Sequence, residues 1–226
     1  MDQLVIQAGK RVTVGDVFSA GSDIFGRHLR ILAIGFVALA ISVTGIDLLP
    51  PSIAQQILAW LLSTLVQWQI FAAILRREGL ITDGVARFRY LALLGSSLAT
   101  AVPMFIGMML LILPGVILLA RWSTAPSMVI AEGKGPIQSL KESWHATKAA
   151  QWPIVGAFVV FGTGCIVLFG VLFSILGFGS ADVGSGGAAT TLNLAVAAVT
   201  VASICLSLGI YRLVRVTSAQ LGEVFG

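Results

Sequence analysis

Long runs of apolar positions alternate with short polar intervals along the whole chain. A transmembrane helix needs about 20 predominantly apolar residues at a rise of about 1.5 Å each. The charge-poor runs therefore predict six spans, at about residues 30–48, 53–75, 90–112, 115–131, 153–178 and 190–211. We expect an all-α polytopic membrane protein, with residues 1–226 forming a single integral membrane domain.

Two polar intervals have the periodicity of amphipathic helices. In residues 14–29, apolar positions recur at helical spacing with charged positions between them. In residues 136–150, Ile137, Leu140 and Trp144 form an i, i+3, i+7 stripe, and Lys141 lies outside it. We expect both segments to be helices that lie along the cytoplasmic surface of the membrane.

Prolines and small residues refine this arrangement. The pairs Pro50-Pro51 and Pro114-Gly115 predict tight turns, after the first and the third run. Small residues let transmembrane helices approach closely. Those in the fifth and sixth runs predict close packing of these two spans, with a pore or flexible gate as the alternative. They are Gly156, Gly162, Gly164, Gly170, Ala195, Ala198 and Ala202.

Composition and charge agree with a membrane protein. The chain is 57% hydrophobic and only 11% charged, whereas about 25% of the residues in soluble domains are charged. Nearly all Lys and Arg residues fall in the N-terminal segment, the second and fourth intervals and the C-terminal segment. This positive-inside bias predicts that both termini are cytoplasmic. It also explains the net charge of +4, so we expect no nucleic-acid partner.

Arg121 is the one basic residue inside a predicted span. A charge at that depth is costly, by about 2.5–3.5 kcal/mol on insertion scales, and normally has a partner. The arginine either snorkels to the outer headgroups or pairs with Asp47 or Asp182, or it lies in a cleft and binds a phosphate or carboxylate. Pro126 favours a cleft, because it can kink the helix and free a carbonyl near Trp122.

The other ionisable residues are weaker candidates for a functional site. Glu132 lies roughly 16 Å from Arg121 along a helix, so we expect it to end the fourth span near Lys134. A proton or charge site is the alternative for Glu132. His28 and His145 have no second ligand at i+3 or i+4, so we expect interfacial side chains and no metal site.

The second polar interval and the known catalytic motifs add two expectations. Arg87 and Arg89 are expected to contact lipid headgroups. Paired carboxylates on one membrane face, a Gly-x-Ser-x-Gly elbow, a P-loop and a dinucleotide fingerprint are all absent from the sequence. We therefore expect no enzymatic activity and no cofactor.

The stretch "LPGVILLARWSTAPSMVIAEGKGPIQSLKESW" at residues 113–144 resembles a motif of bacterial six-span proteins. These are the YciC-like proteins, grouped with the membrane domain of glycerophosphoryl diester phosphodiesterases. Ser139 stands where family members tend to have alanine. The positions that carry the resemblance are Pro114, Gly115, Arg121, Pro126, Glu132, Leu140, Ser143 and Trp144.

The resemblance implies an accessory, envelope-related protein of the bacterial inner membrane. It implies no catalytic site, because the phosphodiesterase chemistry of fusion proteins belongs to a separate soluble barrel that this sequence does not show. The leading hypothesis is a non-catalytic protein that engages membrane phospholipid or a membrane-protein partner, with Arg121 as the anion contact. The alternatives are a small transporter or channel, and a structural or assembly subunit of a membrane complex.

Overall fold

The computed structural model describes the backbone of residues 12–81, 89–110, 112–176 and 186–225. The described residues form nine helices. They are α1 (Val14–Arg27), α2 (Leu29–Asp47), α3 (Ile53–Arg77), α4 (Arg89–Leu110), α5 (Ile112–Trp122), α6 (Ala125–Glu132), α7 (Pro136–Ala146), α8 (Gln151–Ile175) and α9 (Gly186–Phe225).

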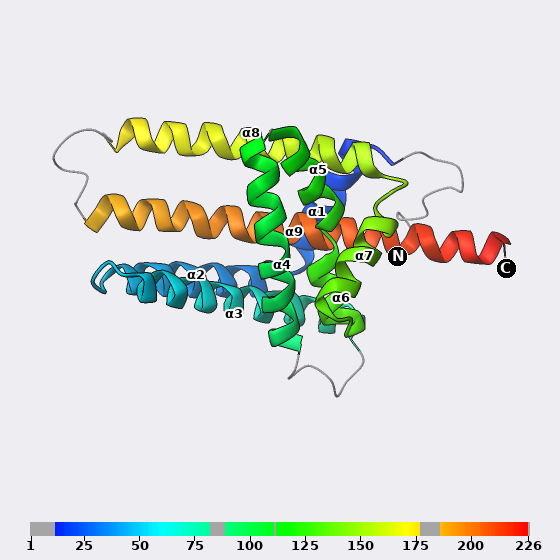
Figure 1. Cartoon of the computed structure of the whole chain (residues 1–226), viewed down its shortest axis with the longest axis horizontal. Coiled ribbons are helices and arrows are strands. Elements are labelled where there is room, and N and C mark those ends of the chain that lie inside the picture. The colour runs from blue at the N-terminus through cyan, green and yellow to red at the C-terminus, as the bar shows by residue number, and fades with distance from the viewer. Residues whose placement is uncertain (1–11, 82–88, 111, 177–185, 226) are drawn as a thin grey trace.

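Four of the described helices are long and apolar enough to cross a membrane: α2, α3, α8 and the Gly187–Arg215 part of α9. They run along the longest axis of the molecule (Figure 1). The all-helical, multi-pass character expected from the sequence is therefore confirmed for the described residues. The full set of six spans and the cytoplasmic placement of the termini stay predictions.

The segment predicted to hold the third and fourth spans is arranged differently. Figure 1 shows α4 running across the long helices, with α5 returning beside it. The expectation of one helix over residues 115–131 is wrong, because α5 ends at Trp122 and α6 begins at Ala125. Pro126 is the second residue of α6, in the first turn, where a missing N–H costs nothing.

The two predicted proline turns have opposite outcomes. Residues 48–52 connect α2 to α3, and Ser52 caps α3 through a reciprocal capping box with Gln55, so the Pro50-Pro51 turn is confirmed. The Pro114-Gly115 turn is wrong, since both residues lie in the first turns of α5. A proline in a first turn needs no intrahelical donor, so it is compatible with a helix start as well as with a turn.

Helix α1 confirms the predicted helical segment at residues 14–29, with Thr13 as its N-cap. It does not simply lie on a surface, because its apolar side packs against α9 around residues 205–214. Val17 and Ile24 are fully buried there. At the crossing a Cβ on Gly209 would lie 2.6 Å from the backbone nitrogen of Gly21, so only glycine at position 209 permits this approach.

The expected packing between the last two spans is wrong. A Cβ at Gly162, Gly164 or Gly170 would meet no atom within 4 Å. Gly156 approaches Val14 of α1 and not α9. Only 6% of the apolar window of α8 is buried inside the chain, against 56% for α9. Two helix backbones approach closely only where both helices carry small residues. The helix that meets this condition against α9 is α1.

Candidate functional site

The break between α5 and α6, at residues 123–124, is stabilised by hydroxyl groups from α7, from its C-cap Thr147 and from α9. Ser143 Oγ in α7 donates to the carbonyl of Arg121 (2.6 Å), and Thr147 Oγ1 donates to the same carbonyl (3.3 Å). Ser207 Oγ in α9 donates to the carbonyl of Ser123 (2.5 Å). These bonds satisfy the carbonyls that a helix end leaves without partners, which a buried break requires.

Helix α7 presents these hydroxyls because of its residue spacing. Ser139, Ser143 and Thr147 follow one another at i, i+4 and i+8, and all three are fully buried. The hydroxyls of Ser143 and Thr124 are also hydrogen-bonded to each other (2.8 Å). This buried polar face of α7 was missed in the sequence, where the i+4 spacing of small hydroxyl residues was its only signal.

The side chain of Arg121 turns toward α7 and the start of α8. Its Nη1 donates to the carbonyl of Trp144 (2.9 Å), its Nη2 donates to Oε1 of Gln151, and the guanidinium lies 4.7 Å from the centre of the Trp144 ring. Arg121 is only 7% exposed. Its Nε–H is buried and has no acceptor.

One of the two internal carboxylates considered for Arg121 is bonded elsewhere, and the other is not described. Asp47 accepts a hydrogen bond from Asn193 (2.7 Å) instead, and Asp182 lies outside the described residues. The expected snorkelling toward the outer headgroups is also wrong, because the guanidinium contacts the segment that follows α6. The reason is the break itself, which brings the end of α5 against α7. None of the ion pairs among the described residues includes Arg121.

Aromatic and basic residues lie close in sequence to the groups that Arg121 contacts. Trp122 packs against Trp144 with ring centres 6.4 Å apart. Trp144 is 37% exposed, and Trp152 at the start of α8 is 69% exposed. Lys141 is exposed one turn before Trp144 on α7. Tryptophan and lysine in this combination are typical of the membrane interface.

The predicted apolar stripe of α7 needs one correction. Leu140 is buried against the protein together with Ser139. Ile137 is 59% exposed, so the outward face of α7 carries Ile137, Lys141 and Trp144 at i, i+4 and i+7. The hydroxyl of Ser143 bonds a carbonyl at the α5–α6 break, so this side of α7 faces the protein interior. Leu140 lies on the same side and is therefore buried.

Glu132 ends α6 close to Lys134, as expected. Lys134 also forms an ion pair with Glu142 of α7, and the hydroxyl of Tyr211 in α9 donates to Glu132 Oε1 (2.8 Å). Burial lowers the pKa of Lys134, but hydrogen bonds to both glutamates raise it, and it ends above the ordinary 10.5. The hydrogen bond from Lys134 lowers the pKa of Glu142.

Arg89 is not a headgroup contact, since it is buried at the end of α6. Its Nη1 donates to the carbonyls of Ile130 and Ala131, where the negative end of the helix dipole favours a cation. Gly133 follows with φ +68° and leaves room for the guanidinium. The other arginine expected at the headgroups, Arg87, lies outside the described residues.

An ionic cluster joins α1, α3 and α9 at the end of the bundle that also holds α6 and α7, which we call the polar end. Arg212 bonds Asp23 (3.2 Å) and Glu78 (2.7 Å). His28 is buried with its Nε2 2.7 Å from Glu78, so the expectation of an interfacial side chain is wrong. His145 is exposed. The cluster forms because α1 folds back onto α9, which no local sequence signal reveals.

Among the described residues, no group of three or more His, Cys, Asp or Glu side chains is placed to hold a metal ion. Comparisons of the chain with protein-family models, with curated proteins and with solved structures found no match.

Proposed function

We propose that this chain is a non-catalytic multi-pass protein of the bacterial inner membrane that binds anionic phospholipid at its polar end. Arg121 is the anion contact in this proposal, with Trp144 and Lys141 beside it at the interface. The polar end and both termini then face the cytoplasm, in line with the positive-inside bias. The motif at residues 113–144 supports membership of the YciC-like family as part of the same proposal.

The observation that carries the proposal is the uncompensated charge of Arg121. A buried guanidinium is costly unless it is paired, yet this one bonds only the neutral acceptors Trp144 and Gln151, and its Nε–H has none. Arg89 also has a buried Nε–H without an acceptor, but it differs because the carbonyls at the negative end of α6 supply its compensation. A phosphate is the anion that a membrane interface offers, and arginine binds phosphate through several N–H donors at once.

Native mass spectrometry of the gently solubilised protein, followed by lipid extraction, tests this proposal. We expect the wild type to retain one more anionic lipid than Arg121→Ala. Arg77→Ala is the matched control, since it removes an exposed positive charge on α3 and should leave lipid retention unchanged. Equal lipid content in the wild type and Arg121→Ala would refute the phosphate contact.

A second variant separates lipid binding from the folding of α7. Arg121→Lys keeps the charge but loses the multidentate donors, so we expect reduced lipid retention with α7 still protected from protease. Loss of that protection in Arg121→Lys would make the arginine a brace for α7 and not a lipid contact.

The orientation is tested by labelling single cysteines from the two sides of intact membrane vesicles, in a chain whose native cysteines are replaced. Asp182→Cys and Lys141→Cys should be labelled from opposite sides. Labelling of both positions from one side would refute the proposed six-span topology.

A second candidate function is favoured by α8. Most of its apolar window is exposed, and Gly162, Gly164 and Gly170 are open. A surface of this kind suits close packing of a transmembrane helix from another protein, as in an assembly subunit. Copurification of one stoichiometric membrane protein that is lost in Gly164→Leu would favour this candidate over lipid binding.

A further inference from the structure

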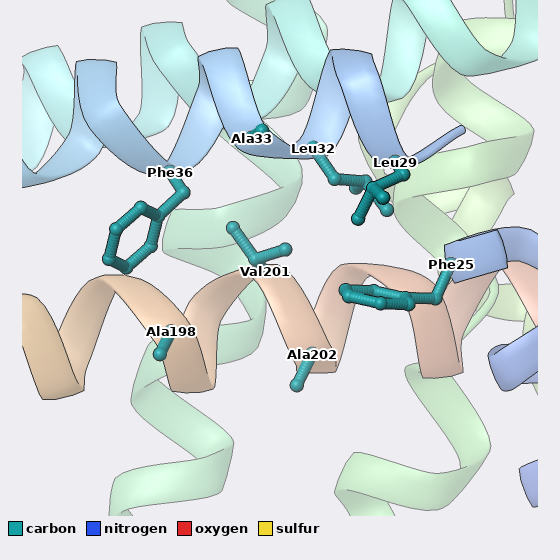
Figure 2. A pocket seen from close by; sticks show the side chains of 8 residues that line it. All are labelled: Phe25, Leu29, Leu32, Ala33, Phe36, Ala198, Val201 and Ala202. Atoms are coloured by element: carbon teal, nitrogen blue, oxygen red, sulfur yellow. The ribbon is translucent and has the colours of Figure 1, made fainter.

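An apolar groove of about 230 Å³ runs between α2 and α9, on residues that do not take part in the α5–α6 break. Figure 2 shows Phe36 of α2 at one end, Phe25 of α1 at the other, and Val201 of α9 between them. Leu29 lies beside Phe25 at the second end. All the side chains that line the groove are hydrocarbon.

The size and chemistry of this groove restrict its occupant. An apolar cavity of about 150 Å³ already stays dry and binds benzene, so this larger groove holds a hydrocarbon segment of at least that bulk. Water has no polar partner here. An empty groove beside lipid forfeits the dispersion contacts of its lining. Because α2 and α9 both contain candidate membrane spans, the hydrocarbon that reaches the groove is a lipid chain.

The charge at one end of the groove selects the headgroup. Arg30 is exposed and lies one helical turn before Ala33, which lines the groove, so it flanks the groove at the end where Leu29 lies. None of the ion pairs among the described residues includes Arg30. It lies next to Leu29, at the α1–α2 junction where the apolar lining ends. A lipid phosphate at this position neutralises the charge of Arg30, while an acyl chain of the same lipid lies in the groove.

We infer that the groove between α2 and α9 binds one acyl chain of an anionic phospholipid, with Arg30 contacting the phosphate. This site is separate from the proposed contact at Arg121, on different helices, and it does not depend on that contact.

The experiment uses the full chain in vesicles of phosphatidylcholine with phosphatidylglycerol, some of which carries a photoactivatable group on the acyl chain. After irradiation, mass spectrometry maps the labelled peptides. The exposed face of α8 reports ordinary boundary lipid and normalises the signal. We expect the α9 peptide around Val201 to be labelled more strongly than α8.

Two sets of variants test the groove and the cation independently. Ala198→Leu with Ala202→Leu fills the groove and should reduce labelling at Val201 to the level of α8. The control, Ala54→Leu, makes the same type of substitution once, at an exposed alanine of α3, and should change nothing. A thermal unfolding measurement in the same detergent verifies that each variant is folded.

Arg30→Gln leaves the groove open but removes the charge. We expect about a fivefold loss of the preference for phosphatidylglycerol over phosphatidylcholine, the equivalent of about 1 kcal/mol for one cation near the membrane surface. Arg77→Gln should not change this preference. The same labels are measured in Arg121→Ala, where labelling at Val201 should persist even if the polar-end lipid is lost.

Three results would overturn the acyl-chain site in the groove. One is labelling at Val201 no stronger than on α8, and another is strong labelling that survives the filled groove. The third is the absence of lipid labelling in the groove together with a cross-linked dimer, because a second copy of the chain would then occupy the groove. An unchanged lipid preference in Arg30→Gln would refute the headgroup contact.

Discussion

The crossing of α1 and α9 makes a sharp prediction about a single methyl group. In Gly209→Ala the new Cβ would lie 2.6 Å from the backbone nitrogen of Gly21 and 2.8 Å from the carbonyl carbon of Ala20. Ordinary van der Waals contact begins at 3.4 Å, so the helices must separate by about 0.8 Å or more. Both clashing atoms belong to backbone, which no change of rotamer relieves.

The expected cost is that of overpacking a tight interface, about 1–3 kcal/mol. The separation also loosens Val17 and Ile24, which are fully buried at this interface. Gly162→Ala is the matched control, since a Cβ there meets no atom within 4 Å. That change should be neutral or stabilising by up to about 1 kcal/mol, because alanine restricts the unfolded chain.

The assay combines denaturant unfolding in a fixed detergent with hydrogen–deuterium exchange of residues 14–27. We expect Gly209→Ala to unfold at lower denaturant and to exchange faster throughout α1, while Gly162→Ala behaves as the wild type or better. Gly21→Ala should lie between them, because its Cβ would be 3.4 Å from Leu206 Cα. Identical stability and α1 exchange for Gly209→Ala and Gly162→Ala would refute the close crossing.

Three further predictions concern α6 and α7. Gly133→Ala should destabilise the protein by about 1–2 kcal/mol, because φ is +68° there, whereas Gly135→Ala, with φ −66°, should have no such cost; thermal unfolding of both variants decides this. Ser143→Ala should cost about 1–3 kcal/mol by removing the hydrogen bond from the Ser143 hydroxyl to the Arg121 carbonyl at the α5–α6 break, and a denaturation midpoint equal to wild type would contradict that role. The ion pair between Lys134 and Glu142 should weaken in acid: the lowered pKa of Glu142 stabilises the fold above its ordinary value of 4.5 and loses this effect as pH falls through the lowered value. Protease protection of α7, measured from neutral pH downward in wild type and Glu142→Gln, should fall in acid only for the wild type.

The sequence predicted those features that depend on local periodicity and local propensity. The apolar runs that became α2, α3, α8 and α9 are long enough to stand out without any knowledge of their neighbours. The helical spacing in residues 14–29 and 136–150 identified α1 and α7 for the same reason. A Pro-Gly pair is less informative, since Pro114 is compatible with both a turn and a first helical turn.

The candidate site was located only in part. Arg121 stood out because a charge inside an apolar run is costly wherever it lies. Its contacts with Trp144 and Gln151 required the break after Trp122, and the break depends on hydroxyls supplied by Ser143 and by α9. No pattern within residues 115–131 contains those donors, so hydrophobicity alone favoured one continuous helix.

The sequence by itself therefore determined that this is a helical membrane protein and which runs are apolar enough to span a membrane. It also showed that one arginine lies inside an apolar run. Tertiary structure decided which faces meet: Gly209 against Gly21, Leu140 inward, and α8 left largely open. In a membrane, helix faces of nearly uniform apolarity do not reveal their partners by hydrophobicity, because lipid competes equally for them. Shape complementarity and the completion of backbone hydrogen bonds choose the partners, and both exist only when distant segments come together.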